Sequence, residues 1–498
     1  MYLRAVGGEQ PSNLEYGEWM GESDSVLWHI ERDPLLRSTI TSVWFLDSVP
    51  DRGRMDAVVE RMAAKIPRLR QRVVDEQPGV APPRWVDDPD VDLDYHYSWA
   101  RLPGWRVTDR DVLDHAQRLA ARAFDKARPL WELYVVDGLP GERAAFVMKV
   151  HHAIADGLGM VQLLAHMVDL EAQVSDAEVA DGGEPVLDDD AVPAAHHVVS
   201  PLWAIPGARA LSHRIANEAR TGARLGKASL RTAAELLRDP LGTIEQLGRT
   251  TGSIARVVKP ATSPLSPLMT GRSLNTHFDA ITVEFDDVKG AARAAGCSLN
   301  DAFVATTLDA LRRYHDAMGS PCEQVRMNMP ISVRGGEGEH RFDNQFVPAR
   351  MTLPLGSGAV GERLVAVRSL LAEVRAEPAL PHVNDISGVI SRLGPAAAVS
   401  VLGAMLKGVD ITTSNVPGPP FPVYMAGAKV ERFYAFGPLA GAAINITLFS
   451  YDGGVHLGIN SDRAAVVDHD LFVRCLHEAF DETLTLTDDP RPHVEVEG

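Results

Sequence analysis

The hydrophobic and polar positions of the chain follow two periods, and both periods occur in each half. Short runs rich in β-branched and aromatic residues predict strands, at residues 38–45, 131–136, 144–150, 279–285, 324–329, 347–353, 409–413, 444–451 and 455–459. Segments with apolar residues three and four positions apart predict helices, at residues 51–66, 111–124, 158–168, 299–314, 363–377 and 468–486. Turn-forming residues after 131–136 and after 444–451 predict two β-hairpins. Strands and helices therefore occur in both halves, which predicts an α/β fold.

A segment of different composition separates the two halves. Residues 171–190 carry eight acidic residues and no Lys or Arg, which predicts a mobile acidic loop. Residues 201–272 have helical character and hold eleven Lys or Arg against four Asp or Glu, a net charge of 11 − 4 = +7. A Pro-rich run at 259–272 ends this segment. We therefore divide the chain into an N-terminal domain, a loop with a helical linker, and a C-terminal domain, at residues 1–170, 171–275 and 276–498.

Composition and charge exclude several classes of protein. The 498 residues are 45% hydrophobic, which suits a globular chain and excludes a wholly disordered one. A net charge of −18 argues against nucleic acid as a partner. The N-terminus lacks the apolar core of a secretory signal, and no run of apolar residues is long enough for a transmembrane helix. Three widely spaced cysteines form no metal-binding pattern and fit a reducing compartment, so we expect a cytoplasmic protein without a bound metal.

The sharpest chemical signal is the sequence HHAIADG at residues 151–157. It follows a predicted strand and opens a predicted helix, so a histidine there can present its imidazole at the edge of a sheet. Asp156 can return toward the loop and fix it, and Gly157 permits the tight turn into the helix. A chance pair of surface histidines is the simplest alternative. A shared metal ion is disfavoured, because His151 and His152 would point to opposite sides of an extended chain.

Further short motifs accompany HHAIADG in a fixed order along the chain. These are Pro129-Leu130-Trp131, Asn300-Asp301 at the start of a predicted helix, SNVPGP beginning at Ser414-Asn415 in a predicted rigid turn, and Asn445-Ile446-Thr447. Together with HHxxxDG, the active-site motif of the CoA-dependent acyltransferase superfamily, they make the chain resemble the bacterial wax ester synthase/diacylglycerol acyltransferase (WS/DGAT) family. The resemblance extends from about residue 28 to about residue 485 and so includes nearly the whole chain.

The resemblance implies a fold and a role for each motif. The fold would be two chloramphenicol acetyltransferase-like α/β domains with an interdomain tunnel and a helical linker. His152 would be the general base, with His151 and Asp156 as supports. Asn300 would donate a hydrogen bond to the oxyanion, although a simple helix-start role for Asn300-Asp301 is equally open. The remaining motif residues would shape the tunnel and the domain junction: Gly157, Pro129, Leu130, Trp131, Asp301, Ser414 and Asn415.

The implied reaction is an acyl transfer from acyl-CoA to diacylglycerol or a long-chain alcohol, without a covalent acyl-enzyme. Acyl-CoA would be a substrate, and no cofactor is implied. The basic segment at 201–272 has three open roles: contact with a peripheral membrane or lipid-droplet surface, binding of the CoA phosphates, or a solvated linker. Two other functions stay open for the chain. One is a condensation-type acyltransferase that uses a carrier-protein thioester, and the other is a non-catalytic lipid-binding homologue.

Overall fold

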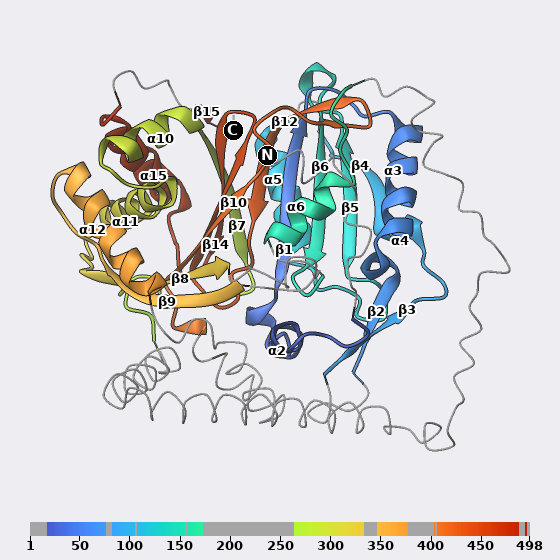
Figure 1. The fold of residues 1–498 in the computed structure, drawn as a ribbon, viewed down its shortest axis with the longest axis horizontal. Helices are drawn as coiled ribbons and strands as arrows, with labels where there is room; N and C mark the ends of the chain where they lie inside the picture. The colour runs from blue at the N-terminus through green and yellow to red at the C-terminus, as the bar shows by residue number, and fades with distance from the viewer. Residues whose placement is uncertain are drawn as a thin grey trace, which may run out of the picture.

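The computed structural model describes residues 17–75, 82–104, 107–154, 157–172, 263–332, 346–376, 403, 406–487 and 494–495. The predicted acidic loop beyond residue 172 and the basic segment up to residue 262 lie outside the described residues. Two β-sheets stand side by side, each with its own helices (Figure 1). The chain is therefore an α/β protein with two sheet-based halves, as predicted.

The first sheet has six strands in the order β11-β12-β1-β6-β5-β4. Their bounds are β1 Thr39–Leu46, β4 Tyr97–Arg101, β5 Trp131–Asp137, β6 Ala144–His151, β11 Tyr424–Met425 and β12 Ala428–Phe436. The antiparallel pair β5 and β6 is the first predicted hairpin. A separate two-stranded sheet, β2 Gln71–Val74 and β3 Arg84–Asp87, lies beside it in the first half.

The second sheet has seven strands in the order β15-β7-β14-β13-β10-β8-β9. Their bounds are β7 Thr276–Glu284, β8 Gln324–Ser332, β9 Phe346–Pro354, β10 Ile411–Pro417, β13 Ile444–Tyr451, β14 Gly454–Asp462 and β15 Val494–Glu495. The second predicted hairpin is β13 and β14, joined at Asp452 and Gly453, which have φ of 43° and 82°. Such a turn suits the twist of the two strands.

Helices cover the sheets in separate layers. The buried side chains of α3 (Arg52–Lys65) and α6 (Gly157–Ala165) pack on one face of the first sheet, and those of α5 (Asp109–Ala120) pack on the other. The outer face of the second sheet is covered by α10 Phe285–Ala294, α11 Leu299–Ala317, α12 Val360–Arg375 and α15 His469–Leu484. Two helices complete the first half, α2 Glu22–Ile30 and α4 Leu93–His96.

Local signals fix most helix ends. Asp51 caps α3 through the Arg54 N–H at 2.8 Å, and Pro67 follows Ile66, the C-cap of the helix. The helix predicted at 111–124 is shifted in the structure, where α5 begins at Asp109 and ends at Ala120. The shift arises because Thr108 and Asp111 form a capping box, which sets the start of the helix two residues earlier.

Strand β12 connects the two halves of the molecule. The chain leaves β10 in the second sheet, enters the first sheet as β12 beside β1, and returns as β13 (Figure 1). The Phe278 ring of β7 stacks on the Phe436 ring of β12 at 4.1 Å. A Cβ built at Gly458 of β14 would lie 2.1 Å from Ala435 O, so the two sheets approach as closely as glycine permits. Residues 424–436 thus belong to the first sheet, although they fall within the range 276–498 predicted for the second domain.

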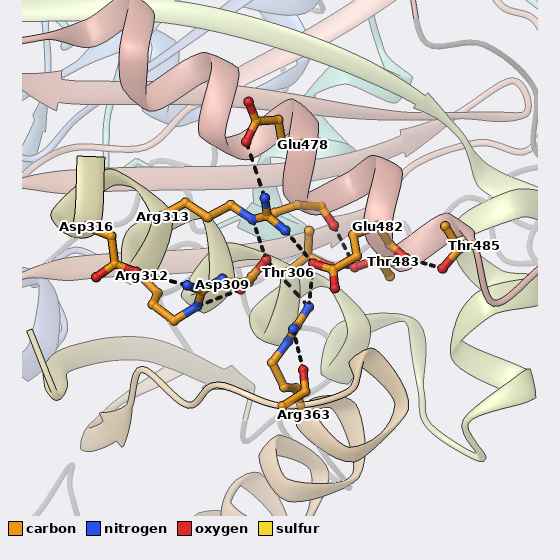
Figure 2. Close-up of polar contacts among 12 residues, drawn as sticks. Thr306, Asp309, Arg312, Arg313, Asp316, Arg363, Glu478, Glu482, Thr483 and Thr485 are labelled. Atoms are coloured by element: carbon orange, nitrogen blue, oxygen red, sulfur yellow. Dashed lines mark hydrogen bonds and ion pairs between the residues drawn. The ribbon is translucent and has the colours of Figure 1, made fainter. Parts of the chain in front are cut away.

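Figure 2 shows an ion-pair cluster that joins three helices of the second half. Asp309 of α11 is buried and accepts from Arg312 and Arg313 of the same helix, at 2.8 and 2.7 Å. Arg363 of α12 lies 3.0 Å from Glu482 of α15. Arginines on one helix therefore pair with carboxylates on the next, and the layer over the second sheet is tied together at its surface.

Candidate active site

The predicted histidine pair lies where β6 ends. His151 is the last residue of β6 and is opposite Thr39 of β1. Successive side chains of a strand alternate between its faces, so His151 shares a face with Lys149, while Val150 packs in the core on the other face beside Trp131. His151 is fully buried and His152 is partly exposed. The strand end therefore separates the two histidines, as the sequence predicts.

Hydrogen bonds hold the backbone of the motif in one conformation. The N–H groups of residues 151–154 all donate, in chain order to Leu130 O at 3.0 Å, Ser38 O at 2.8 Å, His151 Nδ1 at 3.0 Å and His151 O at 2.9 Å. Two of these acceptors belong to neighbouring segments of the first sheet, and two belong to His151 itself. The backbone of the turn that carries His152 is consequently held by contacts to the two neighbouring segments and by contacts within the turn.

The His151 imidazole has a defined environment. Its Nδ1 accepts from the Ala153 N–H, and its Nε2 lies 3.0 Å from Glu31 Oε1. The rings of Trp28 and Phe124 meet it edge to face, with centroids 6.0 and 6.1 Å away. Because a backbone N–H can only donate, the Nδ1 atom carries no proton in this arrangement.

Glu31 is a buried carboxylate directly after α2. Its Oε1 accepts from the Ser38 N–H at 2.7 Å, and its Oε2 lies 3.3 Å from Lys126 Nζ. Burial alone would raise the pKa of Glu31, but its contacts with His151, the Ser38 N–H and Lys126 outweigh burial, and the pKa lies below its usual value. Glu31 is therefore an anion beside the motif. No spacing in the chain connects residue 31 with residue 151, so the sequence alone does not point to Glu31.

A second buried ion pair lies beneath the motif. Lys149 Nζ donates to Glu132 Oε1 at 2.9 Å, and Glu132 Oε2 accepts from the Tyr134 hydroxyl at 2.7 Å. The Lys149 ammonium also lies over the Phe124 ring, 4.2 Å from its centroid. Burial lowers the pKa of Lys149, and Glu132 opposes that effect. The Lys149–Glu132 ion pair thus joins β6 to β5, in addition to the backbone hydrogen bonds between the two strands.

The Pro129-Leu130-Trp131 motif is buried at the start of β5. Leu130 contributes the carbonyl that accepts the His151 N–H. The Trp131 indole donates to Leu69 O at 2.8 Å and stacks on His96 at 4.5 Å. The motif therefore contacts the histidine turn directly through its backbone, and its large side chain fixes the neighbouring 67–70 segment.

The second set of predicted residues gathers at the N-terminus of α11. Ser298 and Asp301 form a reciprocal capping box, so Asp301 serves the helix start. Asn300 Oδ1 accepts from Asn415 Nδ2 at 3.4 Å, which brings these two predicted residues together. Asn300 Nδ2 faces Met329 Sδ at 3.7 Å, and a thioether is a weak acceptor. The amide of Asn300 consequently keeps donor capacity for a substrate.

The segment SNVPGP differs from its prediction as a rigid turn. Ser414 and Asn415 lie within β10, which runs to Pro417 in parallel pairing with β13. The strand continues because the proline is its final residue, where it interrupts nothing. The irregular segment begins at Gly418, where a Cβ would lie 2.4 Å from the Phe449 ring.

The structure therefore places the predicted residues in two sets, one in each half of the molecule. His151, His152, Leu130 and Trp131 lie in or next to β5 and β6 of the first sheet. Ser414 and Asn415 lie in β10 of the second sheet, and Asn300 and Asp301 lie in α11, which covers that sheet. Gly157 is the first residue of α6. Asp156 lies outside the described residues. In the part of the chain that the structure describes, no group of three or more His, Cys, Asp or Glu side chains could hold a metal ion, and no helix is long and apolar enough to span a bilayer.

Comparison with known proteins finds a family domain for each half of the chain. Residues 20–303 match the wax ester synthase/diacylglycerol acyltransferase catalytic domain, and residues 342–483 match the WS/DGAT C-terminal domain. A Mycobacterium tuberculosis protein named as a candidate diacylglycerol O-acyltransferase is 34% identical over 98% of this chain and 96% of its own length. Another from the same species is 26% identical over 83% of this chain and 82% of its own length.

Solved structures share the fold. The wax ester synthase/diacylglycerol acyltransferase of Marinobacter aquaeolei VT8 superposes with a TM-score of 0.58 at 21% identity, covering 94% of this chain and 99% of that chain. The first condensation domain of the calcium-dependent antibiotic synthetase gives 0.56 at 17% identity, covering 97% of this chain and all of that domain, 100%. Both carry the two-domain fold that the HHxxxDG resemblance implies. With both family domains matched in order along its length, the chain belongs to the wax ester synthase/diacylglycerol acyltransferase family and is an acyltransferase.

Proposed function

We propose that the chain transfers the acyl group of an acyl-CoA to the hydroxyl of a diacylglycerol or of a long-chain alcohol, which gives a triacylglycerol or a wax ester. The observation that carries this proposal is the turn at residues 151–154, whose N–H groups are all engaged and whose His152 side chain is partly exposed. The family description names wax ester synthesis and the acylation of diacylglycerol, and the relatives' names favour diacylglycerol as the acceptor.

In the proposed reaction His152 is the general base. It removes the proton of the acceptor hydroxyl while that oxygen attacks the thioester carbonyl carbon. The tetrahedral intermediate then collapses, the carbon–sulfur bond breaks, and the proton passes from His152 to the CoA sulfur. No acyl-enzyme forms, and the sequence has no GxSxG nucleophile turn.

Asn300 is the proposed oxyanion donor. Its Oδ1 is engaged by Asn415, so the amide is oriented with Nδ2 toward a weak acceptor, the Met329 sulfur. A developing negative oxygen accepts more strongly than a thioether, so the amide can serve the transition state better than the resting state. Asp156 is the proposed support of the loop. A tunnel between the domains would keep water from the thioester.

The test is a transfer assay with purified protein and radiolabelled palmitoyl-CoA, offered diolein in one reaction and hexadecanol in another. Thin-layer chromatography should show labelled triacylglycerol, wax ester or both. If the chain uses palmitate only when it is bound to a carrier protein, the condensation-type alternative holds instead. If it binds the lipids and forms no ester under any condition, it is a non-catalytic homologue.

We further propose that the protein is cytoplasmic and meets its lipid acceptor at a membrane or lipid-droplet surface through the basic segment at 201–272. Each Lys or Arg near an anionic surface contributes about 1 kcal/mol, and salt weakens that attraction. Changing Arg214, Arg220, Arg224 and Lys227 to Glu should release the protein from anionic vesicles and leave activity on detergent-dispersed acceptor unchanged. A raised KM for acyl-CoA with normal vesicle binding assigns the segment to the CoA phosphates, and no change in either makes it a linker.

A further inference from the structure

One carboxylate oxygen contacts both the histidine turn and Ser38, the residue that holds the turn from the neighbouring strand end. Glu31 Oε1 accepts from the Ser38 N–H at 2.7 Å and lies 3.0 Å from His151 Nε2. The carbonyl of the same Ser38 accepts the His152 N–H at 2.8 Å. Glu31 thus contacts the ring of one histidine and, through one residue, holds the backbone of the other.

The contacts of His151 select one tautomer of its ring. The Ala153 N–H donates to Nδ1 at 3.0 Å, so the proton of the neutral ring is on Nε2, and that nitrogen lies 3.0 Å from a carboxylate oxygen of Glu31. In the other tautomer an Nδ1 proton would confront the Ala153 N–H, and the Nε2 lone pair would confront the carboxylate. Both neighbours therefore favour the same tautomer, and the loss of either one weakens the turn.

We propose that Glu31 is a positioning residue for acyl transfer: it fixes the Nε2–H tautomer of His151 and the backbone of Ser38, and through both it places the imidazole of His152. This inference rests on the proposed role of His152 as general base. Glu31 touches no reacting atom and acts through its two neighbours. Misplacement of a catalytic group by about 1 Å costs on the order of 10²-fold in rate, so a fixed turn has a direct effect on turnover.

The setting of Glu31 makes its contacts hard to replace. Its side chain is 8% exposed, while that of Lys126, its other partner, is 43% exposed. Trp28 closes the site from α2, with the Lys126 ammonium 3.9 Å from the centroid of its ring. Water can therefore reach the lysine more readily than the buried face of His151, and removal of the carboxylate takes the anion away from the buried Nε2 atom.

Two substitutions separate positioning from simple stability. Glu31→Leu removes the acceptor, and we expect kcat to fall about 10- to 100-fold with the KM for acyl-CoA within about threefold of wild type. Glu31→Gln keeps an oxygen acceptor, and kcat should recover to within about fivefold of wild type. A Glu31→Leu variant with wild-type kcat, or a Glu31→Gln variant as impaired as Glu31→Leu, overturns the assignment.

Asp109→Asn is the matched control. Asp109 is a buried carboxylate that pairs with Arg143 at 2.9 Å and with Arg432. Arg432 is opposite Phe45, at the other end of β1 from the Thr39–His151 pair. This variant should lower the melting temperature as Glu31→Leu does, but kcat per folded molecule should stay at the wild-type value. A kcat loss equal to that of Glu31→Leu would make the effect of Glu31 a general loss of stability and overturn the assignment.

A spectroscopic measurement tests the geometry without any substrate. Histidine-specific ¹⁵N labelling reports the tautomer of each of the 17 histidines, and the His151→Gln variant assigns the signal of His151. Wild type and Glu31→Gln should show the Nε2–H form, and Glu31→Leu should show a mixture. A wild-type His151 in the Nδ1–H form overturns the assignment. Failure to transfer palmitate to any acceptor would instead overturn the proposed function, and the tautomer measurement distinguishes the two failures.

Discussion

Lys149 Nζ lies 2.9 Å from Glu132 Oε1 in a pair that is buried between β5 and β6, two residues before His151. The lysine side chain is fully enclosed, so neither water nor salt can replace its partner. Burying two charges costs solvation free energy that their attraction repays only while both are present. The pair therefore makes the strand beneath the histidine turn sensitive to the loss of either charge.

The first prediction follows from that pair. Lys149→Met should lower the free energy of unfolding by about 3–5 kcal/mol, because Glu132 is left buried and uncompensated. The double variant Glu132→Gln/Lys149→Met should be more stable than the single one, since no unpaired charge remains. Urea unfolding of the four members of this double-mutant cycle measures the coupling. Additive losses would show that the two groups do not act as a pair.

The second prediction concerns His152. His152→Ala should lower kcat by about 10²–10⁴-fold, the usual contribution of a general base. Its unfolding midpoint should stay close to wild type, because the side chain is partly exposed and the backbone N–H still reaches Ser38. His151→Ala is the comparison: it removes a fully buried ring and should lower both stability and rate. Retention of wild-type kcat by His152→Ala contradicts the general-base role.

The third prediction concerns Asn300 at the start of α11 and Asn415 of β10, which meets it there. Asn300→Ala should reduce kcat about 10²-fold if its amide serves the oxyanion, with little change in KM. Asn415→Ala should cause a smaller loss, because it removes only the donor that orients Asn300 Oδ1. Steady-state kinetics at saturating acyl-CoA distinguish the two effects. An Asn300→Ala enzyme within twofold of wild type would leave this residue with the helix-start role alone.

Elements whose signals are local could be predicted from the sequence. The strands of both hairpins and the start of α11 at Leu299 are predicted correctly, because the periodicity and the turn residues that signal them lie within a few positions of one another. The α2 helix was not predicted, since it is short and its segment has mixed character. The strand at 428–436 was not predicted either, because its pairing with β1 depends on a segment from the other half of the chain.

The same distinction explains what could be predicted of the site. HHxxxDG identifies His151 and His152 within one short segment, and the structure gives both a fixed backbone. Glu31 becomes part of the site only when β1 brings Ser38 beside the end of β6. The pairing of Asn300 with Asn415 likewise requires β10 and the start of α11 to meet. Contacts of this kind carry no spacing that a single sequence can display.

The last prediction concerns the cluster in Figure 2, where Asp309 is enclosed by three arginines: Arg312 at 2.8 Å, Arg313 at 2.7 Å and Arg363 at 3.5 Å. Burial raises the pKa of Asp309, but its hydrogen bonds to Arg313 and Arg312 outweigh burial, so its pKa lies below the usual value. Asp309→Asn should lower the free energy of unfolding at pH 7 by about 3 kcal/mol, because two-sided pairing of a buried carboxylate is lost.

The loss of stability caused by Asp309→Asn should depend on pH. An unfolded aspartate has a pKa of about 3.9, and the pKa of Asp309 in the folded protein is lower. Asp309 therefore adds to the free energy of unfolding only when its carboxyl group is ionised. Its contribution is complete above the unfolded pKa and disappears as the pH falls through the folded one. The difference in the free energy of unfolding between wild type and Asp309→Asn should therefore be constant from about pH 7 to 5 and should narrow below about pH 4.

Urea midpoints at pH 7, 5 and 3.5 measure this difference. Asp316→Asn is the control: Asp316 pairs with Arg312 at the surface and is 50% exposed, so it should contribute little at any pH. A difference that widens on acidification would contradict the conclusion that the arginines stabilise the ionised form of Asp309.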